Sequence, residues 1–211
     1  MPDAVIPKQV LRVLLAEDDE AARTTLVELL QAMGHLVVAE VASGSDAITQ
    51  ARDLIPDAVI LDVHMPGATG VQAAQEIATA LPGVAVLLVT GDASLTLSMQ
   101  DAMATGAVAL LPKPTPPGTL DSTLRLAVTR AQELLVARQE AAQAKEQLEH
   151  RKLIERAKGL LMRRTGASEP EAYRILQRTS QDRSVPMISI AKAILDSEPG
   201  LAAGTAPNKK G

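Results

Sequence analysis

The sequence of 211 residues contains no cysteine, no tryptophan, no phenylalanine and a single tyrosine, Tyr173. The absence of cysteine excludes disulfides, thiolate metal sites and thiol nucleophiles, and it suits a reducing compartment. The core must therefore be filled by Leu, Val, Ile, Ala and Met. Any mechanism that needs an aromatic ring can use only Tyr173.

Long apolar runs are missing as well. No stretch approaches the roughly 18 apolar residues that span a bilayer, and residues 1–8 lack the features of a signal peptide. These absences predict a cytoplasmic protein with no membrane partner. Apolar residues still make up 46% of the chain, which excludes a disordered protein.

The charge is distributed unevenly along the chain. Residues 1–150 carry 9 Lys and Arg against 19 Asp and Glu, whereas residues 151–211 carry 12 against 6. This asymmetry indicates two modules with different partners, and anionic polymers are candidates for the second. A basic helix can equally be an ordinary solvated face.

Five short apolar runs alternate with helical patterns in the first half of the chain. Three of the runs are nearly continuous Val, Leu and Ile, as in strands buried on both faces of a parallel sheet. Five such strand–helix repeats predict a flavodoxin-like, doubly wound α/β domain over residues 10–119, after a flexible segment 1–9. The predicted strands are 11–16, 36–41, 58–63, 84–90 and 108–111.

Helical patterns continue to near the end of the chain. Residues 120–150 form a helical linker whose apolar stripe is a weak coiled-coil seam, and this seam suits either a homodimer or packing within the chain. Residues 151–197 are expected to form a small all-α bundle of three helices. Gly166 ends the first of these, and Ser168 with Glu171 resembles a capping box that opens the second. The tail, 198–211, is expected to be disordered.

Polar residues stand at the ends of four predicted strands. The first strand is followed by Glu17 and Asp18, the third reaches Asp62, the fourth ends at Thr90 and the fifth is followed by Lys113. In a doubly wound sheet, ligands bind beyond the carboxyl ends of the strands. We therefore expect these side chains to share one cleft.

The chemistry of this set favours phosphoryl transfer. Three carboxylates repel one another unless a divalent cation neutralises them, and oxygen ligands suit Mg²⁺. Transfer of a phosphoryl group requires positioning and charge neutralisation, which a metal, a lysine and a hydroxyl can supply. Asp62 is the best nucleophile, because it stands alone in its turn.

The segments LLAEDDE, VILDVHMPG, LLVTGD and LLPKP together resemble the receiver domain of two-component response regulators. The resemblance implies that Asp62 accepts a phosphoryl group from a sensor histidine kinase. It also implies that Glu17, Asp18, Asp62 and the backbone carbonyl of His64 bind Mg²⁺, while Thr90 and Lys113 sense the phosphoryl oxygens. Asp19 is the less suitable metal ligand of the acidic run, and the His64 side chain is expected to be a solvent-exposed bystander.

One position departs from the family pattern. Receivers usually carry Tyr or Phe three residues before the lysine, where rotation of the ring reports phosphorylation. Here that position is Leu110, and Thr115 follows Lys113-Pro114 in place of the common Phe. We expect the signal to pass through the Thr90 loop and the long helix.

The segment ERAKGLLMRRTGASEPEAYRILQRTSQDRSVPMISIAKAIL resembles the ANTAR domain of transcription antitermination regulators. The resemblance implies an RNA-binding module that, as a dimer on phosphorylation, binds hairpins in leader RNA. RNA loops are bound through cationic contacts and base stacking. The best candidates for contacts are Lys158, Tyr173, Arg178, Gln181 and Arg183, although Tyr173 can equally be a core ring.

Two other function classes remain open. The helical module can instead bind a protein partner when Asp62 is phosphorylated, in which case its affinity should depend little on salt, unlike RNA binding. An aspartyl-phosphate hydrolase is the third class. It is disfavoured because His64, two residues after Asp62, replaces the second carboxylate that such enzymes use, so the chain is not expected to be an enzyme.

Overall fold

The computed structural model describes residues 9–66, 68–91, 102 and 104–197. Two compact units share one long helix: residues up to Arg138 form unit 1, and those from Gln139 form unit 2. The predicted tail and most of the predicted flexible N-terminus lie outside the described residues. No helix in the described part of the chain combines the length and apolar character that crossing a membrane requires.

Unit 1 is built on a parallel sheet of five strands in the order β2-β1-β3-β4-β5. The strands differ from their predicted bounds by no more than one residue at either end, and the doubly wound fold is confirmed. β3 and β4 are buried along their whole length, which explains their continuous apolar sequences. The strands are β1 (Arg12–Ala16), β2 (Leu36–Val41), β3 (Ala58–Asp62), β4 (Ala85–Thr90) and β5 (Ala109–Pro112).

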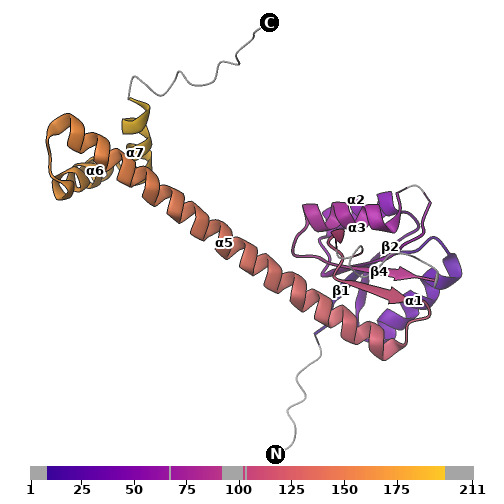
Figure 1. The fold of residues 1–211 in the computed structure, drawn as a ribbon. Coiled ribbons are helices and arrows are strands. Elements are labelled where there is room, and N and C mark those ends of the chain that lie inside the picture. Colours follow the sequence, from indigo (N-terminus) through magenta and orange to yellow (C-terminus); the bar gives the residue numbers. More distant parts are fainter. Residues whose placement is uncertain (1–8, 67, 92–101, 103, 198–211) are drawn as a thin grey trace, which may run out of the picture. The chain divides into compact units, whose positions relative to one another are not determined.

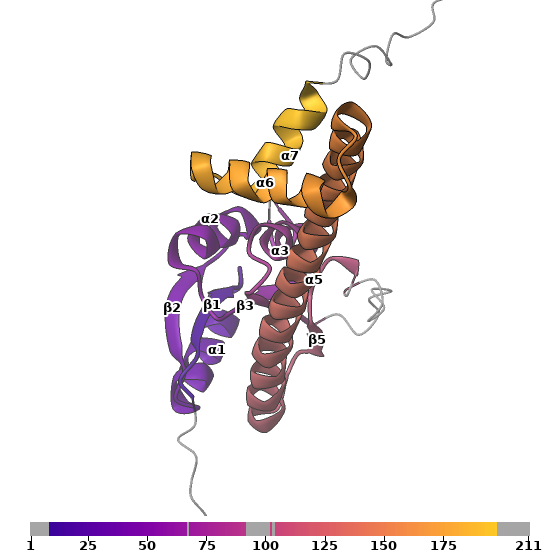
Figure 2. The same cartoon turned by 90° about the vertical axis from the view of Figure 1, so that its left-hand side faces the viewer.

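Helices cover both faces of this sheet (Figures 1 and 2). Helices α2 (Gly44–Leu54) and α3 (Gly70–Ala80) pack on one face, while α1 (Glu20–Ala32) and the start of α5 (Pro117–Thr165) pack on the other. Alternate strand residues enter the two cores. Leu14 and Leu61, for example, point to one side and Leu15 and Ile60 to the other.

The first turns of α5 belong to unit 1. The side chains of Leu120, Leu124, Ala127 and Ala131 are buried in the core that α5 forms with α1 and the sheet. The first half of the predicted linker therefore packs within the chain, which is one of the two alternatives that its apolar stripe allowed. The stripe becomes exposed further along, from Ala137 to Glu149.

Unit 2 contains the end of α5 together with α6 (Glu169–Arg183) and α7 (Met187–Asp196). A small core of Ala157, Leu176, Ile190 and Ala191 joins the three helices. The capping box at the start of α6 is present: the Ser168 backbone N–H donates to the Glu171 carboxylate at 2.8 Å. The predicted three-helix bundle is thus confirmed.

Candidate functional site

The three carboxylates predicted to bind metal meet at the carboxyl end of the sheet. Glu17 and Asp18 directly follow β1, and Asp62 is the last residue of the neighbouring strand β3. One carboxylate oxygen from each lies within 4.8 Å of the others. Chain connections from β1 and β3 diverge to opposite sides of the sheet here, so this edge is the ligand-binding crevice of a doubly wound fold.

Lys113 joins two of these carboxylates. Its ammonium lies 2.5 Å from Oε2 of Glu17 and 2.9 Å from Oδ1 of Asp62. The lysine follows β5, and its backbone N–H donates to the Thr90 carbonyl at 2.7 Å, which ties the ends of β4 and β5 together. The structure therefore brings Glu17, Asp62 and Lys113 into direct contact, with Thr90 buried at the neighbouring strand end.

Burial and charge act on the site in opposite directions. The pKa of Glu17 is raised because its side chain is buried and because Asp62 and Asp18 lie nearby, although Lys113 partly offsets this. Burial acts to lower the pKa of Lys113, yet that pKa is raised because hydrogen bonds and charge from Glu17 and Asp62 outweigh burial. A single ammonium thus contacts two of the three acids, and negative charge remains in excess.

This donor set fits a divalent cation. All three carboxylates offer oxygen, the ligand that Mg²⁺ prefers, and the exposure of Asp18 leaves room for the water molecules that Mg²⁺ retains. Burial chiefly raises the pKa of Glu17, and the nearby Asp62 and Asp18 add to that rise, so a bound cation would relieve the repulsion among the three acids. The His64 side chain is exposed, as expected of a residue that takes no part through its ring.

This cleft is also shaped by three residues to which the sequence motifs give no role. Asp19 caps α1 by accepting a hydrogen bond from the Ala22 N–H at 2.7 Å, which explains why it follows the acidic pair. Arg23 donates to the Glu17 backbone carbonyl at 2.7 Å and so fixes the turn that carries Glu17 and Asp18. Gly70, the first residue of α3, lies directly against Asp62. A Cβ at this position would lie 1.9 Å from the Asp62 carbonyl oxygen, so the contact leaves no room for a side chain.

Of these three roles, only that of Asp19 as the N-cap of α1 could be predicted from the sequence. An acidic residue just before a helical pattern is a typical N-cap signal. The roles of Arg23 and Gly70 arise from contacts across a turn and between two elements, and neither contact has a signature in residue spacing.

Leu110, which replaces the usual aromatic residue, is partly buried against the core beneath α2 and α3. It pairs with Leu88 in the parallel ladder between β5 and β4. An aliphatic side chain packed in this way has no polar tip that could exchange partners between core and solvent. Leu110 therefore serves as a packing residue of the sheet, and this position offers no aromatic ring to report phosphorylation.

Lys158 lies in unit 2 and is engaged within it. Its ammonium contacts Glu155 at 2.9 Å on the same helix and Glu169 at 2.8 Å at the start of α6, while its side chain is 9% exposed. The pKa of Lys158 is raised by these hydrogen bonds, first that of Glu169 and then that of Glu155. These contacts give Lys158 a structural role between α5 and α6.

The other predicted contact residues are exposed on α6. Tyr173 keeps 44% of its surface accessible. Arg178, Gln181 and Arg183 are exposed as well, at the carboxyl-terminal half of the helix. Arg174, which the sequence analysis did not single out, lies one turn before Arg178 on the same face and could have been found from its i, i+4 spacing.

Comparison with protein families divides the chain in the same way. Residues 13–125 match the response regulator receiver domain, and residues 142–195 match the ANTAR domain. The transcriptional regulatory protein PdtaR of Mycobacterium tuberculosis is 39% identical over 195 residues, which cover 92% of each chain.

Solved structures agree on the fold of unit 1. The signal receiver domain of a modulated diguanylate cyclase from Desulfovibrio desulfuricans G20 superposes with a TM-score of 0.54 at 26% identity, covering 59% of this chain and 98% of that one. The receiver domain of the sensor histidine kinase PA1611 from Pseudomonas aeruginosa PAO1, described with magnesium in its active-site cleft, gives 0.52 at 24% identity and covers 57% and 99%. The second likeness is one of fold alone.

Proposed function

Because the chain belongs to the response regulators that join a receiver domain to an ANTAR domain, we propose that Asp62 accepts a phosphoryl group and that unit 2 converts this event into RNA binding. The observation that supports the first step is the contact of the Lys113 ammonium with both Glu17 and Asp62 inside the acidic crevice. The donor is a phosphohistidine of a sensor histidine kinase.

The transfer is an in-line displacement at phosphorus. A carboxylate oxygen of Asp62 forms the new O–P bond as the N–P bond of the phosphohistidine breaks, and the imidazole nitrogen retains the electron pair and takes up a proton. Lys113, which already contacts Asp62, moves its hydrogen bond to a phosphoryl oxygen. The hydroxyl of Thr90, at the end of the adjacent strand, donates a hydrogen bond to a second phosphoryl oxygen.

Glu17, Asp18 and Asp62 would hold Mg²⁺ together with the backbone carbonyl of His64. When bound, the cation neutralises charge on the phosphoryl oxygens. Arg23 keeps the Glu17–Asp18 turn in place during the reaction through its hydrogen bond to the Glu17 carbonyl. The chemistry of the receiver is confined to gaining and losing this phosphoryl group.

Unit 2 supplies the output. Tyr173 offers an exposed ring for stacking on an unpaired base, and the exposed Arg174, Arg178, Gln181 and Arg183 on the same helix supply polar and cationic contacts. The proposed target is a hairpin in a leader RNA, where binding prevents a terminator from forming. A phosphorylation-dependent homodimer would present two such surfaces.

The test is to sequence RNA crosslinked to wild-type protein and to Asp62→Ala protein in cells. Wild-type protein should enrich hairpin-containing leaders, and Asp62→Ala should lose most of that enrichment. Affinity for a selected leader should fall steeply with salt as counterions are released. If phosphorylated protein bound leaders no better than random RNA, or if its main ligand were a protein bound independently of salt, the proposed output would be wrong.

A further inference from the structure

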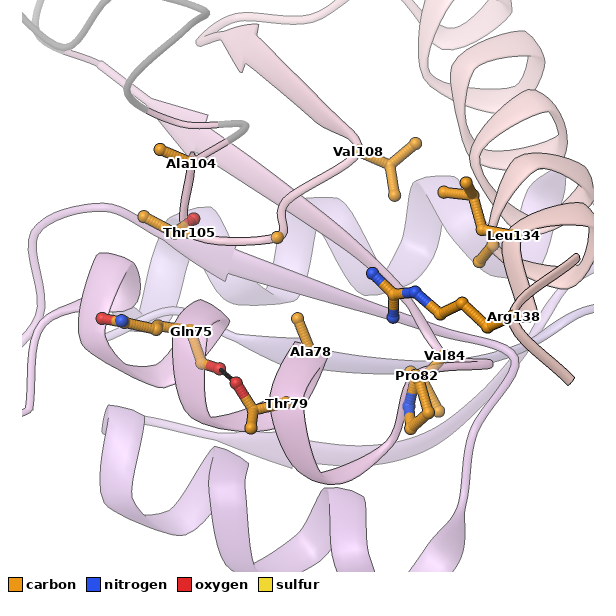
Figure 3. Close-up of a pocket in the computed structure, with 12 residues that line it drawn as sticks. Gln75, Ala78, Thr79, Pro82, Val84, Ala104, Thr105, Val108, Leu134 and Arg138 are labelled. Carbon is orange, nitrogen blue, oxygen red and sulfur yellow. Dashed lines mark hydrogen bonds between the residues drawn. The ribbon is translucent and has the colours of Figure 1, made fainter. Parts of the chain in front are cut away.

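A groove of about 400 Å³ opens in unit 1 at the edge of the sheet opposite the acidic crevice. Val84 and Val108 contribute to it just before β4 and β5 begin, whereas the acidic residues follow the other ends of the strands. Its remaining walls come from α3, α5, Pro82 and the segment at residues 104–106 (Figure 3). All of its lining residues lie between Gln75 and Arg138.

The walls combine apolar and polar side chains, and one of the polar side chains is a cation. Ala78, Val84, Val108 and Leu134 line the interior. The Arg138 guanidinium points into the space between Val108 and Ala78 (Figure 3). Concave sites that bind small molecules combine apolar side chains with a few polar groups that fix the orientation of the ligand.

The guanidinium of Arg138 makes no hydrogen bond or ion pair with any other residue that the structure describes. This distinguishes it from Arg130, two turns earlier on the same helix. Arg130 lines a second groove of about 450 Å³, but its guanidinium is paired with Glu133 at 3.1 Å. The two grooves are alike in size, and they differ in whether the cation already has an anionic partner.

The floor of the first groove is formed by a close approach of two segments. A Cβ on Gly106 would lie 2.5 Å from the Ala78 side chain, so only glycine permits the loop before β5 to pass so near α3. Gly106 also has a φ of +88°, which favours glycine. The floor of the groove is therefore set by backbone geometry.

We propose that this groove binds a small amphiphilic acid, with its carboxylate on Arg138 and its aliphatic body against Val84, Val108 and Leu134. A carboxylate matches the planar guanidinium in a bidentate fashion. Such a ligand bridges α3 and α5 within unit 1 and stabilises the folded form in proportion to its occupancy.

Decanoate, used below its micellar concentration, is the probe, and binding to the full chain is measured by calorimetry. Wild-type protein should bind it saturably. Arg138→Gln should weaken decanoate binding by at least about tenfold, the loss expected for a hydrogen bond to a charged group. Arg130→Gln, the same change on the same helix, should leave the affinity unchanged. Decanol, which lacks the charge, should bind more weakly and respond to neither substitution.

A second variant tests the apolar wall. Leu134→Glu places a carboxylate one turn before Arg138, where it can pair with the guanidinium at i, i+4 without disturbing the helix. It should abolish decanoate binding while the protein remains folded. Methyl NMR signals of Val84, Val108 and Leu134 should shift on titration of the wild type, whereas those of Leu126 in the second groove should not.

Three results would overturn the proposal. The first is an absence of saturable decanoate binding, and the second is an equal affinity of wild type and Arg138→Gln for decanoate. The third is binding of an acidic decapeptide without binding of decanoate, because the groove would then be a protein-docking surface.

Discussion

The first residue of α3 approaches the backbone of Asp62 so closely that a side chain has no room. A Cβ on Gly70 would lie 1.9 Å from the Asp62 carbonyl oxygen and 3.1 Å from the Val63 Cα. These contacts involve backbone atoms, which cannot rotate away as the end of a side chain can. The position of Asp62, the proposed phosphoacceptor, thus depends on a residue with no chemistry of its own.

Gly70→Ala should therefore lower both stability and phosphoryl acceptance. Overpacking of this kind typically costs about 1–3 kcal/mol of unfolding free energy, and a backbone clash lies at the upper end. Gly118→Ala is the matched control, because nothing lies within 4 Å of its Cβ position and it is helical. That control should be neutral or stabilising by up to about 1 kcal/mol. Urea unfolding and phosphotransfer assays compare the two, and equal effects would show that the close contact is unimportant.

Leu110 gives a second prediction at the scale of one residue. Because it packs against the core and offers no polar tip, Leu110→Ala should leave the ratio of RNA affinities with and without phosphorylation unchanged. Stability should fall by about 2 kcal/mol or less, since the side chain is only partly buried. The measurement is RNA binding in both states. If Leu110→Tyr sharply increased the ratio, an aromatic relay would be functional after all.

At the scale of elements, Lys158 joins α5 and α6. In the sequence this lysine is only one member of a basic run. Lys158 contacts Glu155 and Glu169, and the pKa of Glu169 is lowered chiefly by its hydrogen bond with Lys158. A carboxyl group whose pKa is lowered in the folded protein stabilises that protein at pH values above the group's ordinary pKa. This stabilisation is lost as the pH falls through the pKa of the folded state. The link between the helices is therefore sensitive to acid.

Lys158→Met should lower the melting temperature of unit 2. The melting temperature of this variant should also fall less steeply than that of the wild type as the pH drops below the ordinary pKa of glutamate. Lys152→Met is the control, since Lys152 pairs with Glu149 at 2.8 Å on the helix surface and joins no second element. Thermal unfolding is measured from pH 7 to pH 3, and the melting temperature at pH 7 separates the two variants, because Lys152 also lowers the pKa of Glu149 and its loss flattens the acid decline as well. Identical profiles for both would contradict the bridging role.

Gly159 lies inside the continuous helix α5, at a point where no other described element crowds it. A Cβ there would meet only the Arg163 guanidinium, at 3.6 Å, so a tight helix crossing within the chain does not explain the glycine. Gly159→Ala should stabilise unit 2 by about 1 kcal/mol through helix propensity. If RNA backbone approaches at this position, the same change should weaken leader binding. Chemical denaturation and a gel-shift titration measure the two effects, and unchanged RNA affinity would exclude such an approach.

These elements show which parts of the fold were predictable from sequence. Strands buried on both faces must be continuously apolar, and the chemistry of phosphoryl transfer demands acids, hydroxyl and lysine at strand ends. The burial of Leu120 and Leu124 was not decided, because a helical stripe looks the same whether it meets a sheet or a second chain. The pairing of Lys158 with Glu169, 11 residues away, depends on how α6 folds back against α5.

At the scale of the whole molecule, one helix contributes to both units. Residues of α5 up to Arg138 belong to the unit with the acidic crevice, and residues from Gln139 belong to the unit with the proposed RNA surface. Helical continuity supplies a covalent, hydrogen-bonded connection between the two. Coupling between the sites is then a free energy that must act equally in both directions.

This reciprocity gives the last prediction. If beryllofluoride, a stable mimic of the phosphoryl group, raises the affinity for a leader hairpin by some factor, then the hairpin must raise the affinity for beryllofluoride by the same factor. Couplings of this kind typically amount to about 1–3 kcal/mol, or roughly 5- to 150-fold. A helix-breaking Gly-Pro pair in place of Ala141 and Ala142, exposed residues outside both cores, should reduce both factors together while each site still binds its own ligand. If both factors survived the break, the signal would pass by another route, such as association of two chains.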